Sequence, residues 1–511
     1  MLKRNLLRHL TRWGMPRSYE SFSFVAIVAL FFACTLPGQS QIFKANPVLY
    51  QSGGSLAQAI AVADVNKDGK PDVIVANWGT EGGGVVGVLF GNGDGTLQTA
   101  ATYTVKFPGA DAVAIGDLNG DDWPDLVVGS NDGFGNPCLS VLLNKGDGTF
   151  EAAVGYSAGY DIRSVAIADV NGDGKPDVIA LDQADSTFTQ SAVAVLLGNG
   201  DGTLGTAVTY ELTIGGTNAL SLAAADLNGD GKPDLVATDA DTKGNGVINV
   251  LLNKGDGTFP SQVTYPSGAF GSSVILGDVN RDGKLDAIVG IPSGSVSVLF
   301  GKGDGTFGTA TVDPTGLARP VSVAMGDFNG DGAPDLAVAG APQNGAPNGK
   351  VAVLLNNGHG TFQTPIIYGS GGRNAFSVAV GNLKQGAKPD LVVADGCDGY
   401  NSSCPLGGGV AVLLGVPATT KTTVTTSRTP SQSGQPVTFT ATVTATEGPI
   451  PNTTTITFYN NGTRIGTAKT MNGAAKFTTS SLTVGTHTIK ASYQSSAFFK
   501  ASSGTVTQVE N

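Results

Sequence analysis

The chain has 511 residues, of which 14% are charged, and its 41 Asp and Glu residues outnumber 30 Lys and Arg residues to give a formal net charge of −11. Nucleic-acid binding requires a stripe of basic side chains, and the sequence shows none, so we expect no nucleic-acid partner. The excess of acid does not indicate a basic partner either. Six acidic loops, described below, hold 19 of the acidic residues, three in each loop plus Asp122.

Residues 1–40 have the pattern of a secretory signal peptide. Basic residues are spread over the first part of this segment, and a run of about 15 mostly apolar residues follows. This run is shorter than the roughly 20 apolar residues that a transmembrane helix needs. Cleavage is expected between Gly38 and Gln41, and Met15 is an alternative start. Residues 31–34, Phe-Phe-Ala-Cys, are a poor lipoprotein signal, so a lipid anchor is the weaker alternative. The segment predicts export to a secreted or cell-surface location, with no membrane span after signal removal.

An acidic nine-residue motif dominates the chain after residue 40. Residues 169–177 read DVNGDGKPD, and five further copies, at intervals of 49 to 57 residues, begin at Asp64, Asp117, Asp226, Asp278 and Asp327. A seventh, degenerate copy at 382–390, NLKQGAKPD, keeps the final Pro-Asp pair and loses the acids before it. The chain therefore contains internal repeats, each about 50 residues long.

A second motif repeats in phase with the acidic one. Residues 142–150, LLNKGDGTF, show an apolar run, Gly-Asp-Gly and another extended segment, which is typical of a hairpin turn. In the third unit we expect strands at 164–170, 177–181 and 192–198, followed by a fourth extended segment that ends near a Tyr. Four strands in about 50 residues is the period of a β-propeller blade. The nearly continuous apolar strands fit blades stacked face to face.

The ends of the repeat region predict how the ring closes. The seventh unit has three strands, but after Leu414 it lacks the hairpin turn and the fourth strand. Residues 40–50 align with 149–156, the fourth segment of another unit, and run directly into the first strand of blade one. We therefore expect a seven-bladed β-propeller over residues 41–416. Its N-terminal segment would be the outer strand of blade seven and would cover an edge that could pair with other chains.

The acidic loops have the oxygen spacing of a calcium site. In the third loop, Asp169, Asn171, Asp173 and Asp177 occupy positions 1, 3, 5 and 9, and Gly174 at position 6 allows a sharp turn. Ca²⁺ takes roughly six to eight oxygen ligands, and the backbone carbonyl of position 7 is the natural fifth protein ligand. The loop is not an EF-hand, because position 12 is Val or Ala instead of Glu and a strand is expected to follow.

Turn formation is the alternative explanation, since Asp, Asn and Gly also favour turns. It does not call for three acids within about 10 Å of one another, which repel unless they are neutralised. Six near-identical copies therefore favour Ca²⁺ at about six sites. The predicted side-chain ligands are Asp64, Asn66, Asp68 and Asp72; Asp117, Asn119, Asp121 and Asp125; Asp169, Asn171, Asp173 and Asp177; Asp226, Asn228, Asp230 and Asp234; Asp278, Asn280, Asp282 and Asp286; and Asp327, Asn329, Asp331 and Asp335. The predicted carbonyl ligands at position 7 are those of Lys70, Trp123, Lys175, Lys232, Lys284 and Ala333.

Two loops depart from the pattern. In blade two, Asp122 replaces the Gly at position 6, where a positive φ suits Asp less well, so this site is the weakest of the six. In blade seven, Asn382, Lys384 and Gly386 stand where Asp, Asn and Asp are needed. We expect blade seven to bind no metal.

Together, the D-x-N-x-D-G-x-x-D loops and the N-x-G-D-G-T-F turns resemble FG-GAP-type (VCBS) repeats. These repeats build the N-terminal propeller of integrin α-subunits and occur in many secreted bacterial proteins. The resemblance covers roughly residues 40–415. It implies a seven-bladed propeller with Ca²⁺ in the loop between the first and second strands of each blade. It also implies ligand recognition on the opposite face, which is made by the loops between strands two and three and between blades.

The remaining segment changes character. Residues 417–430 are predicted to be a Thr/Pro-rich linker and the start of a sandwich, and alternating runs over 420–511 predict the short strands of a β-sandwich. The run VTFTATVTA at 437–445, with the later GTHTIKASY, resembles bacterial Ig-like domains of cell-surface proteins. The mature chain is therefore predicted to be all-β, a seven-bladed β-propeller followed by an Ig-like β-sandwich.

The sequence does not favour an enzyme. His9 lies in the signal segment, His359 replaces the Asp of a hairpin turn, and His487 is expected to point out of an Ig-like strand. The mature chain carries no nucleophile-elbow or zinc-ligand signature. A calcium-dependent polysaccharide lyase is an alternative by fold analogy alone, and a passive envelope spacer is another.

The predicted function is binding or adhesion by a monomeric propeller, with an extracellular glycan or protein as the partner. The loops between strands two and three vary from blade to blade, and variable loops suit recognition. Trp78, Phe134 and Tyr400 lie in these loops and offer flat apolar surfaces to a ligand, although each could instead pack against its own loop. Cys397 and Cys404 share one loop, and export favours a disulfide between them.

Overall fold

The computed structural model describes residues 41–78, 83–131, 138–183, 190–212, 218–241, 243–342, 349–386, 388–396, 409–446 and 448–511. The elements of these ranges are β-strands, which confirms the all-β prediction. They hold no helix with the length and apolar character needed to cross a membrane.

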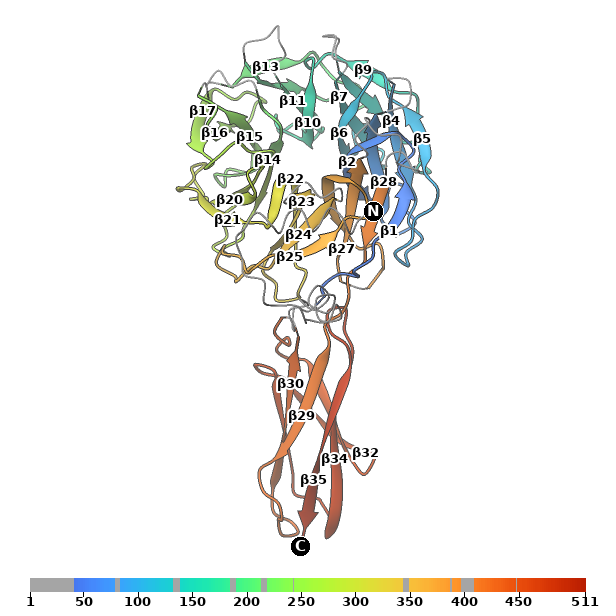
Figure 1. Ribbon diagram of the computed structural model, residues 1–511, viewed down its shortest axis with the longest axis vertical. Helices are drawn as coiled ribbons and strands as arrows, with labels where there is room; N and C mark the ends of the chain where they lie inside the picture. The colour runs from blue at the N-terminus through green and yellow to red at the C-terminus, as the bar shows by residue number, and fades with distance from the viewer. Residues whose placement is uncertain are drawn as a thin grey trace, which may run out of the picture. The chain divides into compact units, whose positions relative to one another are not determined.

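The described part of residues 48–413 forms seven four-stranded antiparallel sheets, the blades, arranged around a ring (Figure 1). Blade one consists of β2 (Leu56–Ala63), β3 (Asp72–Trp78), β4 (Gly84–Leu89) and β5 (Ala101–Thr104). Blade two consists of β6 (Ala110–Gly116), β7 (Asp125–Ser130), β8 (Leu139–Leu142) and β9 (Val154–Tyr156). Blade three consists of β10 (Ile162–Ala168), β11 (Asp177–Asp182), β12 (Ala192–Leu196) and β13 (Val208–Glu211). Blades four and five consist of β14 (Leu222–Ala225), β15 (Asp234–Ala240), β16 (Gly246–Leu252) and β17 (Ser261–Pro266); and β18 (Ser273–Gly277), β19 (Asp286–Ile291), β20 (Ser295–Leu299) and β21 (Thr311–Pro314). Blades six and seven consist of β22 (Leu317–Gly326), β23 (Asp335–Pro342), β24 (Lys350–Leu354) and β25 (Ile366–Gly369); and β26 (Asn374–Gly381), β27 (Asp390–Gly396), β28 (Gly409–Leu413) and β1 (Val48–Gln51).

The N-terminal strand closes the ring, as the sequence predicts. β1 pairs antiparallel with β28, with Val48 opposite Val412. Just before β1, the amide of Lys44 donates a 2.9 Å hydrogen bond to the carbonyl of Leu414. Phe43 is fully buried in a core made by blades six and seven. The two ends of the repeat region therefore complete one sheet.

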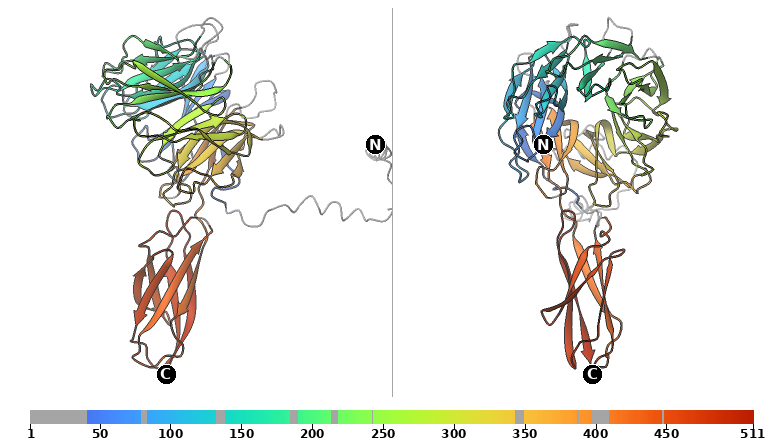
Figure 2. Two further views of the ribbon diagram at one scale, coloured as in Figure 1. Left: turned by 90° about the vertical axis from the view of Figure 1, so that its left-hand side faces the viewer. Right: turned by 180° about the vertical axis from the view of Figure 1, so that it is seen from behind.

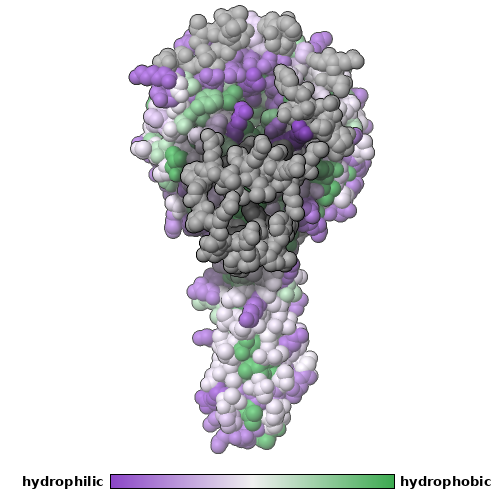
Figure 3. All heavy atoms as spheres, in the orientation of Figure 1, coloured by the Kyte–Doolittle hydropathy of each residue, from purple (hydrophilic) through white to green (hydrophobic). Residues whose placement is uncertain are grey.

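The first strand of each blade lies at the centre of the ring, and the fourth lies outside (Figures 1 and 2). In blade three, β12 is fully buried, whereas β13 is mostly exposed. Cores form between neighbouring blades, as where Ile74 and Val86 of blade one join Leu126 and Val128 of blade two. Because both faces of the inner strands are covered, their sequences are nearly continuous apolar runs. The described residues on the face shown in Figure 3 are mainly hydrophilic, with apolar residues in small separate patches.

In blades one, three, four and five, the Gly-Asp-Gly turn donates a backbone hydrogen bond to the loop between the first and second strands of the blade before it. The amide of Gly202 in blade three donates to the carbonyl of Leu118 in the acidic loop of blade two at 3.1 Å. The same bond runs from Gly95 of blade one to Leu383 of blade seven, also at 3.1 Å. Leu383 lies in the degenerate loop. That loop has lost its acids but still connects the last blade to the first.

The described residues from 420 onward form two sheets that enclose a separate core. One sheet consists of β29 (Thr420–Thr426), β30 (Val437–Ala445) and β33 (Ala474–Thr479), and the other of β32 (Thr463–Lys469), β31 (Thr455–Asn460), β34 (Gly485–Tyr493) and β35 (Ser502–Glu510). Strand structure already begins at Thr420, inside the segment predicted as linker and start of the sandwich.

His487 is a correction to the sequence-based expectation. It was predicted to point outward from its strand, but only 5% of it is exposed. Along β34 it shares the buried face with Ile489 and Ala491, because alternate residues of a strand point to the same side. Its Nδ1 lies 3.1 Å from Oδ1 of Asn460, and its Nε2 lies 2.7 Å from the carbonyl oxygen of Thr483.

Candidate functional site

The topology places two kinds of loop on opposite rims of the propeller. Each acidic loop joins the first strand of a blade to the second, and the Gly-Asp-Gly turns join the third strand to the fourth on the same rim. We call this the acidic rim. The second strands end and the first strands begin on the opposite rim, which we call the variable rim, because successive strands are antiparallel. Trp78, the last residue of β3, and Asp111, near the start of β6, lie on the variable rim.

The acidic loops are closed by hydrogen bonds from their own backbone. In blade three, Oδ1 of Asp169 accepts from the amide of Gly172 at 2.7 Å, and its Oδ2 accepts from the amide of Gly174 at 2.8 Å. Asn171 Oδ1 accepts from the amide of Asp173 at 2.8 Å. The side-chain oxygens of positions 1 and 3 are thus turned toward the interior of the loop.

The final Asp of the motif has a different task. Asp177 is fully buried, and its two carboxylate oxygens accept from the amides of Val170 at 2.9 Å and Gly198 at 2.8 Å. It therefore ties the acidic loop to the end of the third strand of its blade. Equivalent bonds run from Val65 and Gly91 to Asp72, from Leu118 and Asn144 to Asp125, from Leu227 and Asn253 to Asp234, from Val279 and Gly301 to Asp286, and from Phe328 and Asn356 to Asp335.

Blade seven keeps these hydrogen bonds in a loop that lacks the predicted calcium pattern. Its loop has lost the other acids, yet Asp390 accepts from the amides of Lys384 at 3.0 Å and Gly415 at 2.8 Å. A buried backbone amide without an acceptor costs about 1–3 kcal/mol. The need for an acceptor explains why Asp390 is present in a loop that otherwise lacks the calcium pattern, a role that spacing alone does not reveal.

Burial and mutual repulsion raise the pKa of these final Asp residues. Loss of hydration raises the pKa of Asp72, Asp125 and Asp286 to about 6 and that of Asp335 to about 7, although two backbone amides act against the shift in each case. The Asp residues at positions 1 and 5 of the same loop raise each pKa further through their negative charge. The pKa values of Asp177 and Asp234 shift in the same direction. A bound cation relieves this repulsion.

The donor set of the six loops suits Ca²⁺ by its chemistry, since carboxylates, a side-chain amide and a backbone carbonyl supply only oxygen. Within the described ranges, however, no three Asp, Glu, His or Cys side chains gather as a ready-made metal cluster. The oxygens of Asp169 and Asp173 accept instead from backbone amides of their own loop. Calcium binding therefore stays a prediction. The melting temperature after removal of calcium by a chelator tests it.

At position 6, the loops of blades two and three have a similar backbone conformation but different residues. Gly174 has a φ of 81°, and Asp122, its counterpart in blade two, has a φ of 70°. The left-handed region costs a residue with a side chain roughly 1–2 kcal/mol relative to Gly. The loop of blade two therefore carries the strain that its sequence predicts.

Position 7 is Lys in four of the six loops, Trp123 in blade two and Ala333 in blade six. Nζ of Lys70 lies 3.1 Å from Oδ2 of Asp68, in an exposed pair. Ala333 is 2% exposed, and the ring of Trp123 lies 4.5 Å from Nζ of Lys67 in the neighbouring blade. Replacement of Lys by Trp123 and Ala333 in otherwise similar loops is consistent with a site that uses only the carbonyl at this position.

On the variable rim, Trp78 is both exposed and bonded to the next blade. It is 41% exposed, and its Nε1 donates to Oδ1 of Asp111 at 2.7 Å. Oδ2 of Asp111 lies 3.2 Å from Nη1 of Arg163, whose Nε lies 2.8 Å from Oδ1 of Asp161. Burial raises the pKa of Asp111 to about 6, against the lowering effect of Arg163. Side chains from blades one, two and three thus form one polar cluster.

Other predicted residues lie outside the described ranges, namely residues 1–40, Phe134, Tyr400, Cys397 and Cys404. Cys138 is described. It is buried, with its Sγ 3.1 Å from the carbonyl oxygen of Tyr160.

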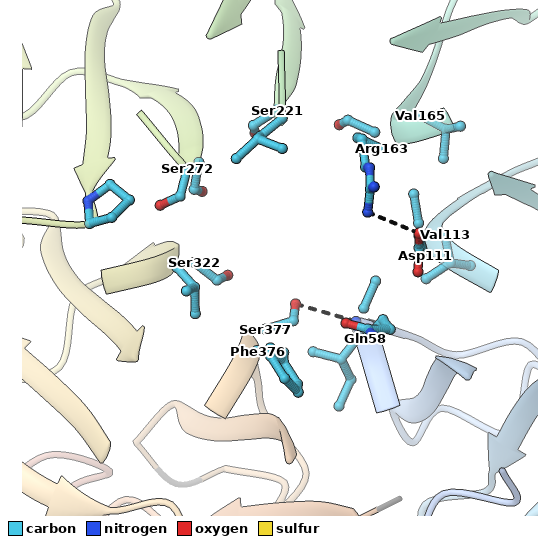
Figure 4. A pocket seen from close by; sticks show the side chains of 18 of the residues that line it. Gln58, Asp111, Val113, Arg163, Val165, Ser221, Ser272, Ser322, Phe376 and Ser377 are labelled. Atoms are coloured by element: carbon cyan, nitrogen blue, oxygen red, sulfur yellow. Dashed lines mark hydrogen bonds and ion pairs between the residues drawn. The ribbon is translucent and has the colours of Figure 1, made fainter. Parts of the chain in front are cut away.

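A pocket of about 600 Å³ opens where the first strands begin, at the centre of the variable rim (Figure 4). Each blade contributes the residue six positions before the first residue of its acidic or degenerate loop, and we call these residues the axial ring: Gln58, Asp111, Arg163, Leu220, Ser272, Val321 and Phe376. The ring is polar in blades one to three and mainly apolar in the others. Neither of the two repeated motifs points to this ring. An alignment of the repeats at this position would reveal it, because the residue differs in every blade.

Comparison with protein families gives matches in both parts of the chain. The FG-GAP-like repeat matches residues 64–128, 117–180, 184–237, 226–289 and 287–338, which together make up more than half of the chain. The bacterial Ig-like domain (group 3) matches residues 424–510.

Similarity to individual proteins is more limited. Integrin alpha-PS3 of Drosophila melanogaster is 39% identical over 82 residues, which are 14% of this chain and 7% of that protein. Two crystal structures of BBS1N in complex with ARL6DN, one soaked with lead and one with mercury, align with a TM-score of 0.46 and 10% identity over 74% of this chain and 98% of the solved chain. On the strength of its repeats, this chain belongs to the family of FG-GAP-like repeat proteins, and its repeats are followed by a bacterial Ig-like domain.

Proposed function

We propose that this protein is an exported, calcium-binding β-propeller that acts as a binding or adhesion module for an extracellular glycan or protein. The observation that carries the proposal is the contrast between the two rims. The acidic rim repeats the same residues and hydrogen bonds in six blades, whereas the axial ring on the variable rim differs in every blade. Uniform loops suit a scaffold, and varied residues suit recognition.

Three further features support the proposal. The FG-GAP-like repeats and the Ig-like domain are typical of extracellular or cell-surface proteins. The composition of residues 1–40 predicts export. Calcium would act on the acidic rim, where it offsets the repulsion among the loop carboxylates, and would support binding only by stabilising the blades.

The test is a binding screen with the purified, calcium-loaded chain against a glycan array and against extracellular protein extracts. We expect at least one ligand to be retained, and Trp78→Ala to weaken its retention severalfold with little change in melting temperature. Asp173→Ala on the acidic rim is the control. It should lower the melting temperature and reduce binding only at temperatures where the variant unfolds, so that binding below its melting temperature stays unchanged.

Two outcomes would overturn the proposal. Absence of any retained ligand would favour a passive spacer. Degradation of a polysaccharide by the purified chain, abolished by one acidic substitution without loss of fold, would favour the lyase.

A further inference from the structure

The wall of the axial pocket contains a set of bonds between blades. Five first strands carry Ser immediately after the axial ring, and its hydroxyl accepts an amide of the first strand in the next blade. These serine links are Ser164 to Leu222 at 3.1 Å, Ser221 to Val274 at 3.0 Å, Ser273 to Val323 at 3.3 Å, Ser322 to Val378 at 3.2 Å and Ser377 to Ile60 at 3.3 Å. The links connect consecutive blades around the axis.

Two positions in this set lack a serine. Blades one and two carry Ala59 and Ala112 where the other blades have Ser. The corresponding amides belong to Val113 and Val165, which hold the same register against their second strands as Leu222 does. Each amide therefore faces a methyl group where the other blades supply a hydroxyl. All four residues line the pocket, next to the polar part of the axial ring (Figure 4).

The charges around the pocket balance. Arg163 and Arg319 line it, and Asp111 also lines it, while Asp161 lies directly against Arg163. Two cationic and two anionic groups leave no net charge to attract a strongly charged ligand. What remains is hydrogen-bonding capacity, including the amide of Gln58.

The axial ring supplies both polar and apolar side chains to the pocket. Gln58, Asp111 and Arg163 are polar, and Val321 and Phe376 are apolar. The hydroxyls of the serine links use a lone pair to accept an amide, which leaves their hydrogens available to donate. Apolar surface facing a few placed polar groups is typical of small-ligand sites, which measure about 300–1,000 Å³. A neutral sugar, which is rich in oxygen atoms and apolar on one face, suits this combination of groups.

We infer that the axial pocket binds a short neutral oligosaccharide, two of whose oxygens accept the amides of Val113 and Val165 in place of the missing serine hydroxyls. This inference rests on the proposed function, because it names the ligand class and the site on the variable rim. The inference is narrower than the proposed function, because the variable rim can bind a protein without any sugar entering the pocket.

The decisive variant completes the serine links. In the double variant Ala59→Ser and Ala112→Ser, hydroxyls occupy the two places that the inference assigns to the ligand. Titration calorimetry uses neutral di- and trisaccharides of glucose, galactose, mannose and N-acetylglucosamine. We expect the unmodified chain to bind at least one of them and the double variant to bind it at least tenfold more weakly. Its melting temperature should stay equal or rise, because two new links form.

Two controls keep the test interpretable. Ala152→Ser makes the same change at an exposed position away from the pocket and should leave both affinity and melting temperature unchanged. Gln58→Ala should weaken binding severalfold without touching the links, so the inference stays testable even if the double variant fails to fold.

Results that contradict only the inference can be distinguished from results that also contradict the proposed function. Neutral-sugar binding that survives the double variant and Gln58→Ala, or binding of anionic oligosaccharides only, overturns the inference. Retention of a protein ligand by the variable rim with no sugar binding also overturns it but leaves the proposed function standing. Absence of every ligand overturns both.

Discussion

The indole nitrogen of Trp78 donates a 2.7 Å hydrogen bond to Asp111, 33 residues later in the chain and in the next blade. The sequence predicts Trp78 as an exposed contact surface, and the structure adds that it holds a member of the axial ring. Asp111 in turn bonds to Arg163 of blade three. The end of β3 in blade one and the centre of the propeller are therefore connected through three side chains.

Removing calcium should destabilise the propeller. A ligand that binds only the folded state stabilises it by about 1.4 kcal/mol per site at roughly tenfold excess over Kd, and about six sites act together. We expect a chelator to lower the melting temperature by many degrees, measured by calorimetry. Sodium chloride at matched ionic strength is the control and should have a much smaller effect. An unchanged melting curve, together with no calcium in elemental analysis, would contradict the six predicted sites.

Deleting residues 41–50 should open the ring. The deletion removes three of the four residues of β1, which pairs with β28 from Val48 opposite Val412 onward, and it removes the buried Phe43. The exposed edge of β28 can then pair with other chains. We expect aggregation in size-exclusion chromatography and loss of cooperative unfolding. Leu49→Thr, at a residue that is 43% exposed on the same strand, should behave like the unmodified protein. A truncated chain that stays monomeric and equally stable would rule out this closure.

Asp122→Gly should stabilise blade two. Asp122 has a φ of 70°, a conformation that Gly adopts without steric cost. The gain is expected to be at most about 1 kcal/mol, because Gly also gives the unfolded chain more freedom. Urea unfolding in saturating calcium measures it. The reverse change in blade three, Gly174→Asp, should lose a similar amount. Lower stability of Asp122→Gly would show that the Asp122 side chain makes a favourable interaction, such as metal binding.

Ionisation of Asp395 should make the free energy of unfolding depend on pH. It is 4% exposed, accepts a 2.7 Å hydrogen bond from the hydroxyl of Ser370, and has its pKa raised by burial to about 7. An acid with a raised folded-state pKa keeps its proton longer in the folded than in the unfolded chain. The free energy of unfolding therefore falls as pH rises from about 4 to about 7, by up to about 1.4 kcal/mol per pH unit.

Asp395→Asn should remove this loss and unfold at higher urea concentration than the unmodified chain at pH 8. Saturating calcium keeps the acidic loops from adding their own titration. Equal loss of stability between pH 5 and pH 8 in both proteins would mean that Asp395 is not the source of the effect.

Much of the fold could be predicted from the sequence because it depends on local patterns. The acidic loops need Gly at position 6 since the backbone there has a positive φ, and the structure shows 81° at Gly174. Apolar runs indicate strands covered on both faces, and the incomplete seventh unit indicates that residues 40–50 complete it. Each of these signals lies within a segment of a few residues or follows from counting repeats.

The pocket that the axial ring lines, the serine links and the hydrogen bonds of Asp390 were decided by tertiary structure. Ser377 and Ile60 are 317 residues apart in the chain, and they meet only because the ring closes. His487 could be placed correctly only once the register of β34 showed which face is buried. Spacing along the chain specifies which groups one loop brings together, whereas contacts between blades depend on how separate sheets pack, and that information is spread over the whole propeller.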